Sequence, residues 1–145
     1  MILTPLLRIL KTTCNNEGVI DTHALIWFAE GSDKLSLLAT AEMDNKNNSK
    51  FISIATLWEI VIKSSKEKLE LKQSFTELNY FLLINNIQII NLEINHLNTL
   101  LKLPHYHGDP FDGLLISQAI SEDLTIISTD KHFKSYPVNC IGKPN

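Results

Sequence analysis

Four acidic side chains fall where predicted strands and helices meet. Asp21 follows the apolar pair Val19–Ile20, and Asp130 follows a second apolar run late in the chain. Glu59 lies early in a predicted helix behind a strand, and Asp112 opens another helix. In a parallel α/β sheet, the functional site lies beyond the carboxyl ends of the strands. We therefore expect these four carboxylates to lie near one edge of the sheet.

Each acid also has a simpler structural explanation. Asp21 and Asp130 could act as helix N-caps, because aspartate is a preferred residue there. Asp112 lies where an acid favours the helix dipole. Glu59 is surrounded by apolar neighbours, so its helix is predicted to be buried and its carboxylate needs a partner. Lys63, four residues further along the helix, could supply that partner.

Four carboxylates at one sheet edge repel one another. At ~6 Å and an effective dielectric constant of ~20, each like-charged pair costs roughly 3 kcal/mol. A divalent cation offsets this repulsion, and oxygen ligands suit Mg²⁺ or Mn²⁺ rather than zinc. Such a site is typical of metal-assisted cleavage of a phosphodiester. Setting the four acids aside leaves 13 basic and 12 acidic residues, a charge of +1 that could hold an RNA backbone.

The elements that must position these acids alternate between short β-like runs and longer helical ones. The chain has 145 residues, 44% of them apolar, which is enough for one domain. Alternation of this kind predicts an α/β domain with a central, mostly parallel sheet flanked by helices. The predicted strands are Val19–Ile20, Phe51–Ile54, Ile87–Leu92, Thr125–Ser128 and Val138–Ile141. The predicted helices are His23–Ala29, Leu37–Met43, Ala55–Lys66, Phe75–Ile84, Ile94–Leu101 and Pro110–Glu122.

Helix starts carry their own signals. Ser53 and Ser74 are predicted N-caps of the helices that follow them. Pro110 suits the first helical position, so Asp109 is predicted to be the N-cap of its helix and to accept the amide of residue 111 or 112. Asp112 then lies in the first turn above an apolar stripe and is predicted to point toward the sheet. Asp109 is thus assigned a structural duty and Asp112 a functional one.

Residues 1–18 do not fit the α/β pattern and are predicted to be an N-terminal extension ahead of a nuclease-like domain at 19–145. Gly18 is expected to cut the first strand short. The two cysteines, Cys14 and Cys140, are too few for a disulfide framework and favour a reduced, cytoplasmic setting. No apolar run is long enough to span a membrane, and residues 1–10 lack the basic start of a signal peptide.

Two other enzyme classes fit the outline less well. A phosphatase with an aspartate nucleophile normally has a second acid two residues after the first, and that position is His23. A receiver domain needs paired acids at the first turn and a phosphoacceptor aspartate at the end of a central strand. Neither pattern is found here.

The sequence resembles the PIN-domain ribonucleases, and most of all the VapC-type toxins of type II toxin–antitoxin pairs. The resemblance covers about residues 19–142 and rests on four blocks in register, which are Val19–Trp27, Phe51–Ile60, His107–Ala119 and Thr129–Asp130. It implies an endoribonuclease that depends on Mg²⁺ or Mn²⁺, is inhibited by a cognate antitoxin and is commonly a homodimer. It also implies that Asp21, Glu59, Asp112 and Asp130 hold the metal and perform catalysis.

The sequence departs from this pattern at two glycines. Gly113 and Gly108 stand where a basic residue is common in the subgroup, and Arg8 is the chain's one arginine. Lysines must therefore make any RNA contacts, as point charges rather than bidentate forks. The alternative is a degenerate PIN domain that binds RNA or a protein partner without cleavage.

Overall fold

The computed structural model describes residues 16–104 and 108–142. Within them the chain order is β1 (Glu17–Ile20), α2 (Thr22–Glu30), α3 (Leu37–Asp44), β2 (Ser49–Ser53), α4 (Ile54–Ser65), α5 (Phe75–Ile84), β3 (Ile87–Ile90), α6 (Ile94–Lys102), α7 (Pro110–Glu122), β4 (Thr125–Ile127), the 3₁₀ helix η1 (Lys131–Ser135) and β5 (Cys140–Ile141). Every predicted element is present. Most of the predicted N-terminal extension, with Cys14, lies outside the described residues.

The five strands form one sheet in the order β3-β2-β1-β4-β5, and every pairing is parallel. The central strand is β1, whose Val19 pairs with Phe51 on one side and with Ile126 on the other. All five carboxyl ends therefore lie at the same edge, as predicted for an α/β fold. Since β1 and β4 are neighbours, the residues that follow them start at adjacent points of that edge.

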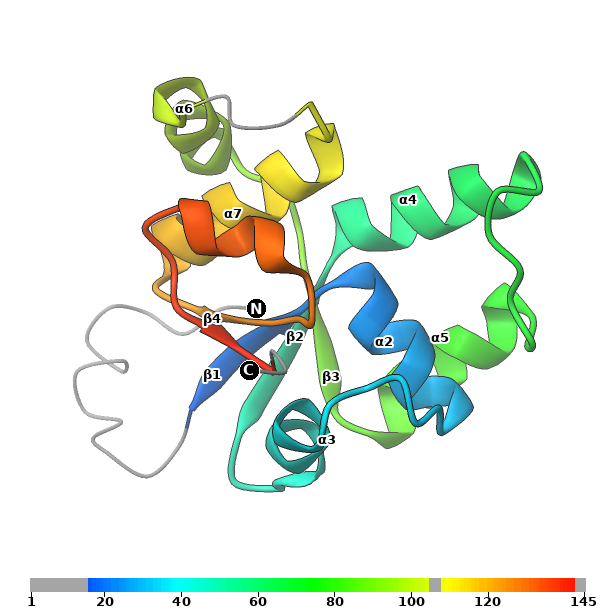
Figure 1. Ribbon diagram of the computed structural model, residues 1–145. Helices are drawn as coiled ribbons and strands as arrows, with labels where there is room; N and C mark the ends of the chain where they lie inside the picture. Colours follow the sequence, from blue (N-terminus) through cyan, green and yellow to red (C-terminus); the bar gives the residue numbers. More distant parts are fainter. Residues whose placement is uncertain (1–15, 105–107, 143–145) are drawn as a thin grey trace.

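Side chains that alternate along the strands build two separate cores. Ile20, Ile52 and Ile127 join the core formed with α2, α3, α4 and α5, whereas their neighbours Val19 and Ile126 face α7 and η1. This is the period-two alternation of a strand buried on both faces. Figure 1 shows α7, with α6 beyond it, on one side of the sheet and α2, α3 and α5 on the other.

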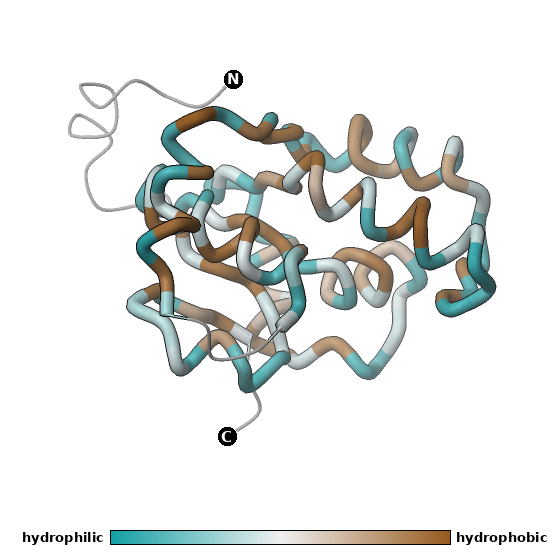
Figure 2. Tube along the Cα trace, turned by 90° about the horizontal axis from the view of Figure 1, so that it is seen from above, coloured by the Kyte–Doolittle hydropathy of each residue, from teal (hydrophilic) through white to brown (hydrophobic). Residues whose placement is uncertain are grey.

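The helix starts confirm the capping predictions. The hydroxyls of Ser53 and Ser74 accept backbone amides at the starts of α4 and α5. Asp109 Oδ1 accepts the amides of Phe111 (2.9 Å) and Asp112 (3.3 Å), and Pro110 occupies the first turn of α7. Along the helices, hydrophobic and hydrophilic stretches alternate (Figure 2), as expected where one face is buried.

The prediction about Gly18 is wrong. Glu17 and Gly18, which we placed in the N-terminal extension, both belong to β1. A Cβ atom at Gly18 would lie 2.7 Å from Cδ1 of Ile127, so the glycine makes room for a side chain of the neighbouring strand. Gly18 thus allows β1 and β4 to pack closely rather than ending the strand.

Among the described residues, no helix has both the length and the apolar character needed to cross a bilayer.

Candidate functional site

The four predicted acids gather at the carboxyl edge of the sheet. Asp21 directly follows β1, Asp130 lies three residues after β4, and Glu59 and Asp112 lie on α4 and α7. The charges of the other three each raise the pKa of Asp112, so each of them lies within electrostatic reach of Asp112. The structure therefore brings together the residues that the sequence analysis selected.

Asp21 is held rigidly at the base of this group. It is 7% exposed, and its Oδ1 accepts the Ala24 amide at 2.8 Å, so it does serve as the N-cap of α2. The Ser128 hydroxyl donates to its second oxygen, and the same Ser128 oxygen accepts the Asp130 amide at 2.8 Å. Burial raises the pKa of Asp21, and these hydrogen bonds oppose the rise. Ser128 thereby couples two of the acids across β1 and β4.

Glu59 is also buried, and two side chains fix it. The Thr22 hydroxyl, next to Asp21, donates to its Oε1, and the Lys63 ammonium donates to its Oε2. The structural explanation offered for Glu59, a partner four residues along the helix, is therefore realised. Lys63 is 34% exposed and also interacts with the charges of Asp109 and Asp112. This lysine therefore interacts with acids at the start of α7 as well as with Glu59 on its own helix.

Burial and several neighbouring acids raise the pKa of Asp112. Burial raises its pKa most, and the charges of Asp109, Glu59, Asp130 and Asp21 raise it further, to about 7. A carboxyl group near that value exchanges its proton around neutral pH and gains from a nearby cation. Asp109 takes the capping duty at the same helix start, as predicted, and the functional duty assigned to Asp112 stays a prediction.

The donor set suits a hard divalent cation. Four carboxylates lie near this edge, one directly after β1, one shortly after β4 and one each on α4 and α7, and oxygen ligands of this kind match Mg²⁺ or Mn²⁺. Among the described residues, no three of these acids have ligand atoms within 4.8 Å of one another, so a bound metal would have to draw them closer. The sequence analysis did not select Thr22 and Ser128. Both are hydroxyl residues within two positions of a selected acid, and that proximity was the available signal.

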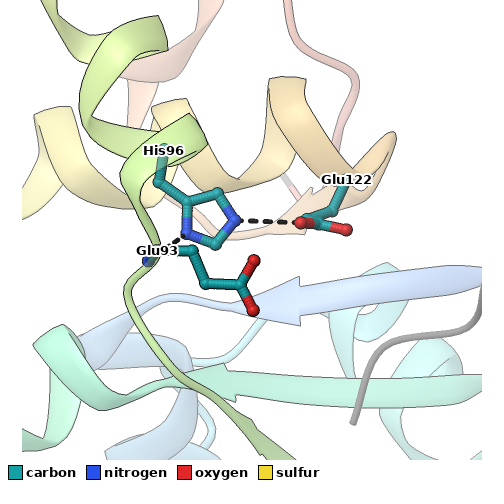
Figure 3. A group of neighbouring side chains, drawn as sticks. All are labelled: Glu93, His96 and Glu122. Atoms are coloured by element: carbon teal, nitrogen blue, oxygen red, sulfur yellow. Dashed lines mark hydrogen bonds and ion pairs between the residues drawn. The ribbon is translucent and has the colours of Figure 1, made fainter.

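A second group of potential ligands lies elsewhere. Glu93, His96 and Glu122 each offer a ligand atom, and these atoms all lie within 4.8 Å of one another (Figure 3). His96 is fully buried, with Nδ1 accepting the Glu93 amide at 3.0 Å and Nε2 lying 2.9 Å from Glu122 Oε1. The group joins the start of α6 to the end of α7.

This second group does not fit a metal ion. Because Nδ1 accepts a backbone N–H, the ring's hydrogen must be on Nε2, which donates it to Glu122. A metal at Nε2 would move that hydrogen to Nδ1, where it would face the Glu93 N–H. Both ring nitrogens are therefore engaged in linking two helices. No sequence pattern pointed to this link, since 26 residues separate His96 from Glu122.

Comparison with known proteins bears on the family and the fold of the chain. Residues 18–139 match the family model of the PIN domain. The chain belongs to the PIN domain family. No curated protein sequence matches this PIN domain at a significant level.

Two solved structures share the fold of this PIN domain. One is VapBC2 from Rickettsia felis bound to a DNA fragment from its promoter, with 21% identity and a TM-score of 0.67 over 86% of this chain and 96% of that one. The other is a toxin–antitoxin complex from Klebsiella pneumoniae, with 18% identity and a TM-score of 0.55 over 83% and 92% of the two chains. At these identities the likeness supports the fold.

Proposed function

We propose that this PIN domain is an endoribonuclease that depends on Mg²⁺ or Mn²⁺ and is the toxin of a toxin–antitoxin pair. The convergence of Asp21, Glu59, Asp112 and Asp130 on one edge of the sheet carries the proposal. Family membership and the two structural neighbours, whose titles name VapBC2 and a toxin–antitoxin complex, support it.

Each residue would have a distinct duty. The four carboxylates would hold the metal, which supplies Lewis-acid activation of a phosphate oxygen and of the attacking water. Ser128 and Thr22 orient Asp21 and Glu59 through their hydroxyl groups. Lys63 holds Glu59 and would offer its ammonium group to the RNA phosphate once the metal satisfies that carboxylate.

A non-cleaving PIN domain is the second candidate, and the Lys63–Glu59 pair favours it. An internal ammonium among the acids could neutralise the site and take the place of a metal. Metal-dependent melting separates the two. If the acids form a metal site, millimolar Mg²⁺ or Mn²⁺ raises the melting temperature by mass action and Asp21→Asn weakens the effect. Identical melting of both proteins with and without metal would remove the metal site.

The direct test is cleavage of single-stranded RNA and DNA with Mg²⁺, with Mn²⁺ and with EDTA. We expect RNA to be cut with either metal and left intact with EDTA, and Asp112→Asn protein to be inactive under all conditions. RNA binding without cleavage would favour the second candidate, and cleavage of DNA alone would overturn the substrate assignment.

The proposal includes an antitoxin, a homodimer and a cytoplasmic location. We expect the antitoxin to place an arginine or lysine side chain among the carboxylates, where charge-assisted hydrogen bonds are strong. Co-purification from the native operon should yield a complex of low nuclease activity that contains two copies of this chain. High expression of this chain alone without harm to the host would argue against a toxin.

A further inference from the structure

An aromatic pair stands beside the acid group. Trp58 on α4 and Phe111 on α7 pack edge to face, with ring centroids 5.3 Å apart and planes at 77°. Trp58 immediately precedes Glu59, and Phe111 immediately precedes Asp112. The pair therefore bridges the two helices that carry two of the four acids.

Trp58 remains largely open to solvent despite this contact. It is 55% exposed, and a single ring packed edge to face can cover at most one side of its indole. The contact with Phe111 limits the movement of the indole. An exposed aromatic ring held in a fixed position is a suitable surface for base stacking, because every nucleobase has a π-face.

We propose that Trp58, held by Phe111, stacks on a nucleobase of single-stranded RNA next to the phosphate that the acids address. This inference rests on the proposed nuclease function. Lys63 lies on a different face of α4 from Trp58, but its ammonium group binds Glu59 in the acid group, where it would meet the phosphate while the base lies on Trp58. The chain has one arginine, outside the described residues, so stacking would supply binding strength that lysine point charges lack.

We favour a nucleobase over an apolar side chain of a protein partner, because the Trp58 ring lies against the helix that carries Asp112. The neighbouring exposed residues Ile54 and Val61 extend an apolar stripe along α4, and the contact with Phe111 places the ring of Trp58 against α7. A stacked base is tolerant of sequence, so the surface would position RNA without selecting a base.

The experiment compares Trp58→Leu, Trp58→Phe and Tyr80→Leu for cleavage of a short single-stranded RNA with Mn²⁺. Tyr80 is the matched control, since it is 64% exposed on α5, which carries none of the acids. We expect Trp58→Leu to raise KM roughly tenfold with kcat within about twofold. Trp58→Phe should stay near the wild type because it keeps an aromatic face, and Tyr80→Leu should change nothing.

Binding can be followed without cleavage. The chain has two tryptophans, so a Trp27→Phe, Asp112→Asn protein reports Trp58 alone. We expect RNA to quench its fluorescence. An inactive wild type would overturn the nuclease proposal, and this titration would still decide on stacking. Base stacking would be overturned if RNA left the fluorescence of Trp58 unquenched, or if Trp58→Leu had an unchanged KM. It would also be overturned if Trp58→Leu lost antitoxin binding but kept its affinity for RNA.

Discussion

The two ends of α7 place half-buried carboxylates in opposite settings. At its start, Asp112 lies among other acids that raise its pKa to about 7. At its end, Glu122 accepts a hydrogen bond from His96, whose other nitrogen is engaged by the Glu93 amide. Carboxylates that raise one another's pKa make the metal-free fold less stable, whereas a carboxylate with a matched donor joins two helices. The first arrangement indicates a binding site, and the second a structural link.

The sharpest test of this contrast changes one acid at each end of α7 to its amide. Asp112→Asn should fold and lose at least about a hundredfold in metal-dependent RNA cleavage, because it removes a direct ligand of the proposed metal. Glu122→Gln should leave cleavage within about twofold. Cleavage rates and circular dichroism of both variants decide the matter. Active Asp112→Asn beside inactive, folded Glu122→Gln would reverse the assignment.

The second prediction concerns stability at the far end of α7. His96→Ala should lower the free energy of unfolding by about 2–4 kcal/mol, because it opens a cavity and leaves the Glu93 amide and Glu122 without this partner. Urea unfolding measures the change. His132 is the control: its ring also contacts an acid, Asp130, but its side chain is 67% exposed, so His132→Ala should cost less than about 0.5 kcal/mol. Equal losses would show that the buried link has no special role.

The third prediction uses pH. The pKa of Asp112 is about 7 in the fold and near 3.8 when unfolded, so between these values the folded protein binds more protons. Stability in EDTA should therefore fall as the pH rises from about 4 to about 7, and the raised pKa of Asp21 acts in the same direction. Asp112→Asn should remove roughly 1–2 kcal/mol of this fall, a figure reduced for the partial exposure of the side chain.

The comparison of the variant with the wild type is made by urea unfolding at pH 4, 6 and 8. Asp112→Asn should be the more stable protein at pH 8, and the two should converge at pH 4. If the free energies of unfolding of the two proteins changed in parallel with pH, the raised pKa of Asp112 would not be the cause of the pH dependence.

The smallest effect separates two neighbouring aspartates. Asp109→Ala removes the N-cap of α7 and should cost about 0.5–2 kcal/mol of stability while leaving most of the cleavage activity. Asp109→Asn, which keeps a capping oxygen, should recover most of the lost stability. A folded but inactive Asp109→Ala protein would show that Asp109 takes part in the chemistry.

Local patterns predicted much of this molecule, because caps and strand alternation are local physics. Ser53, Ser74 and Asp109 cap the helices that they precede. Gly18 was misinterpreted because the side chain it accommodates, Ile127, comes from a strand more than a hundred residues away.

The site itself shows the same limit. Topology rules predicted that acids following parallel strands meet at one edge, which brought Asp21 and Asp130 together. The contacts that hold them, from Ser128 to Asp21 and from Thr22 to Glu59, depend on distances that no spacing in the sequence encodes. The His96–Glu122 link escaped prediction for the same reason.

The position of β1 sets the timing of assembly during synthesis. This strand is the first described element to leave the ribosome, yet it lies in the middle of the sheet and pairs with β4, which is made about a hundred residues later. Asp21 therefore lacks its hydrogen bond from Ser128 and its charged neighbour Asp130 until that later segment has been made. The acid group is therefore completed only after the segment that carries Ser128 and Asp130 has been translated.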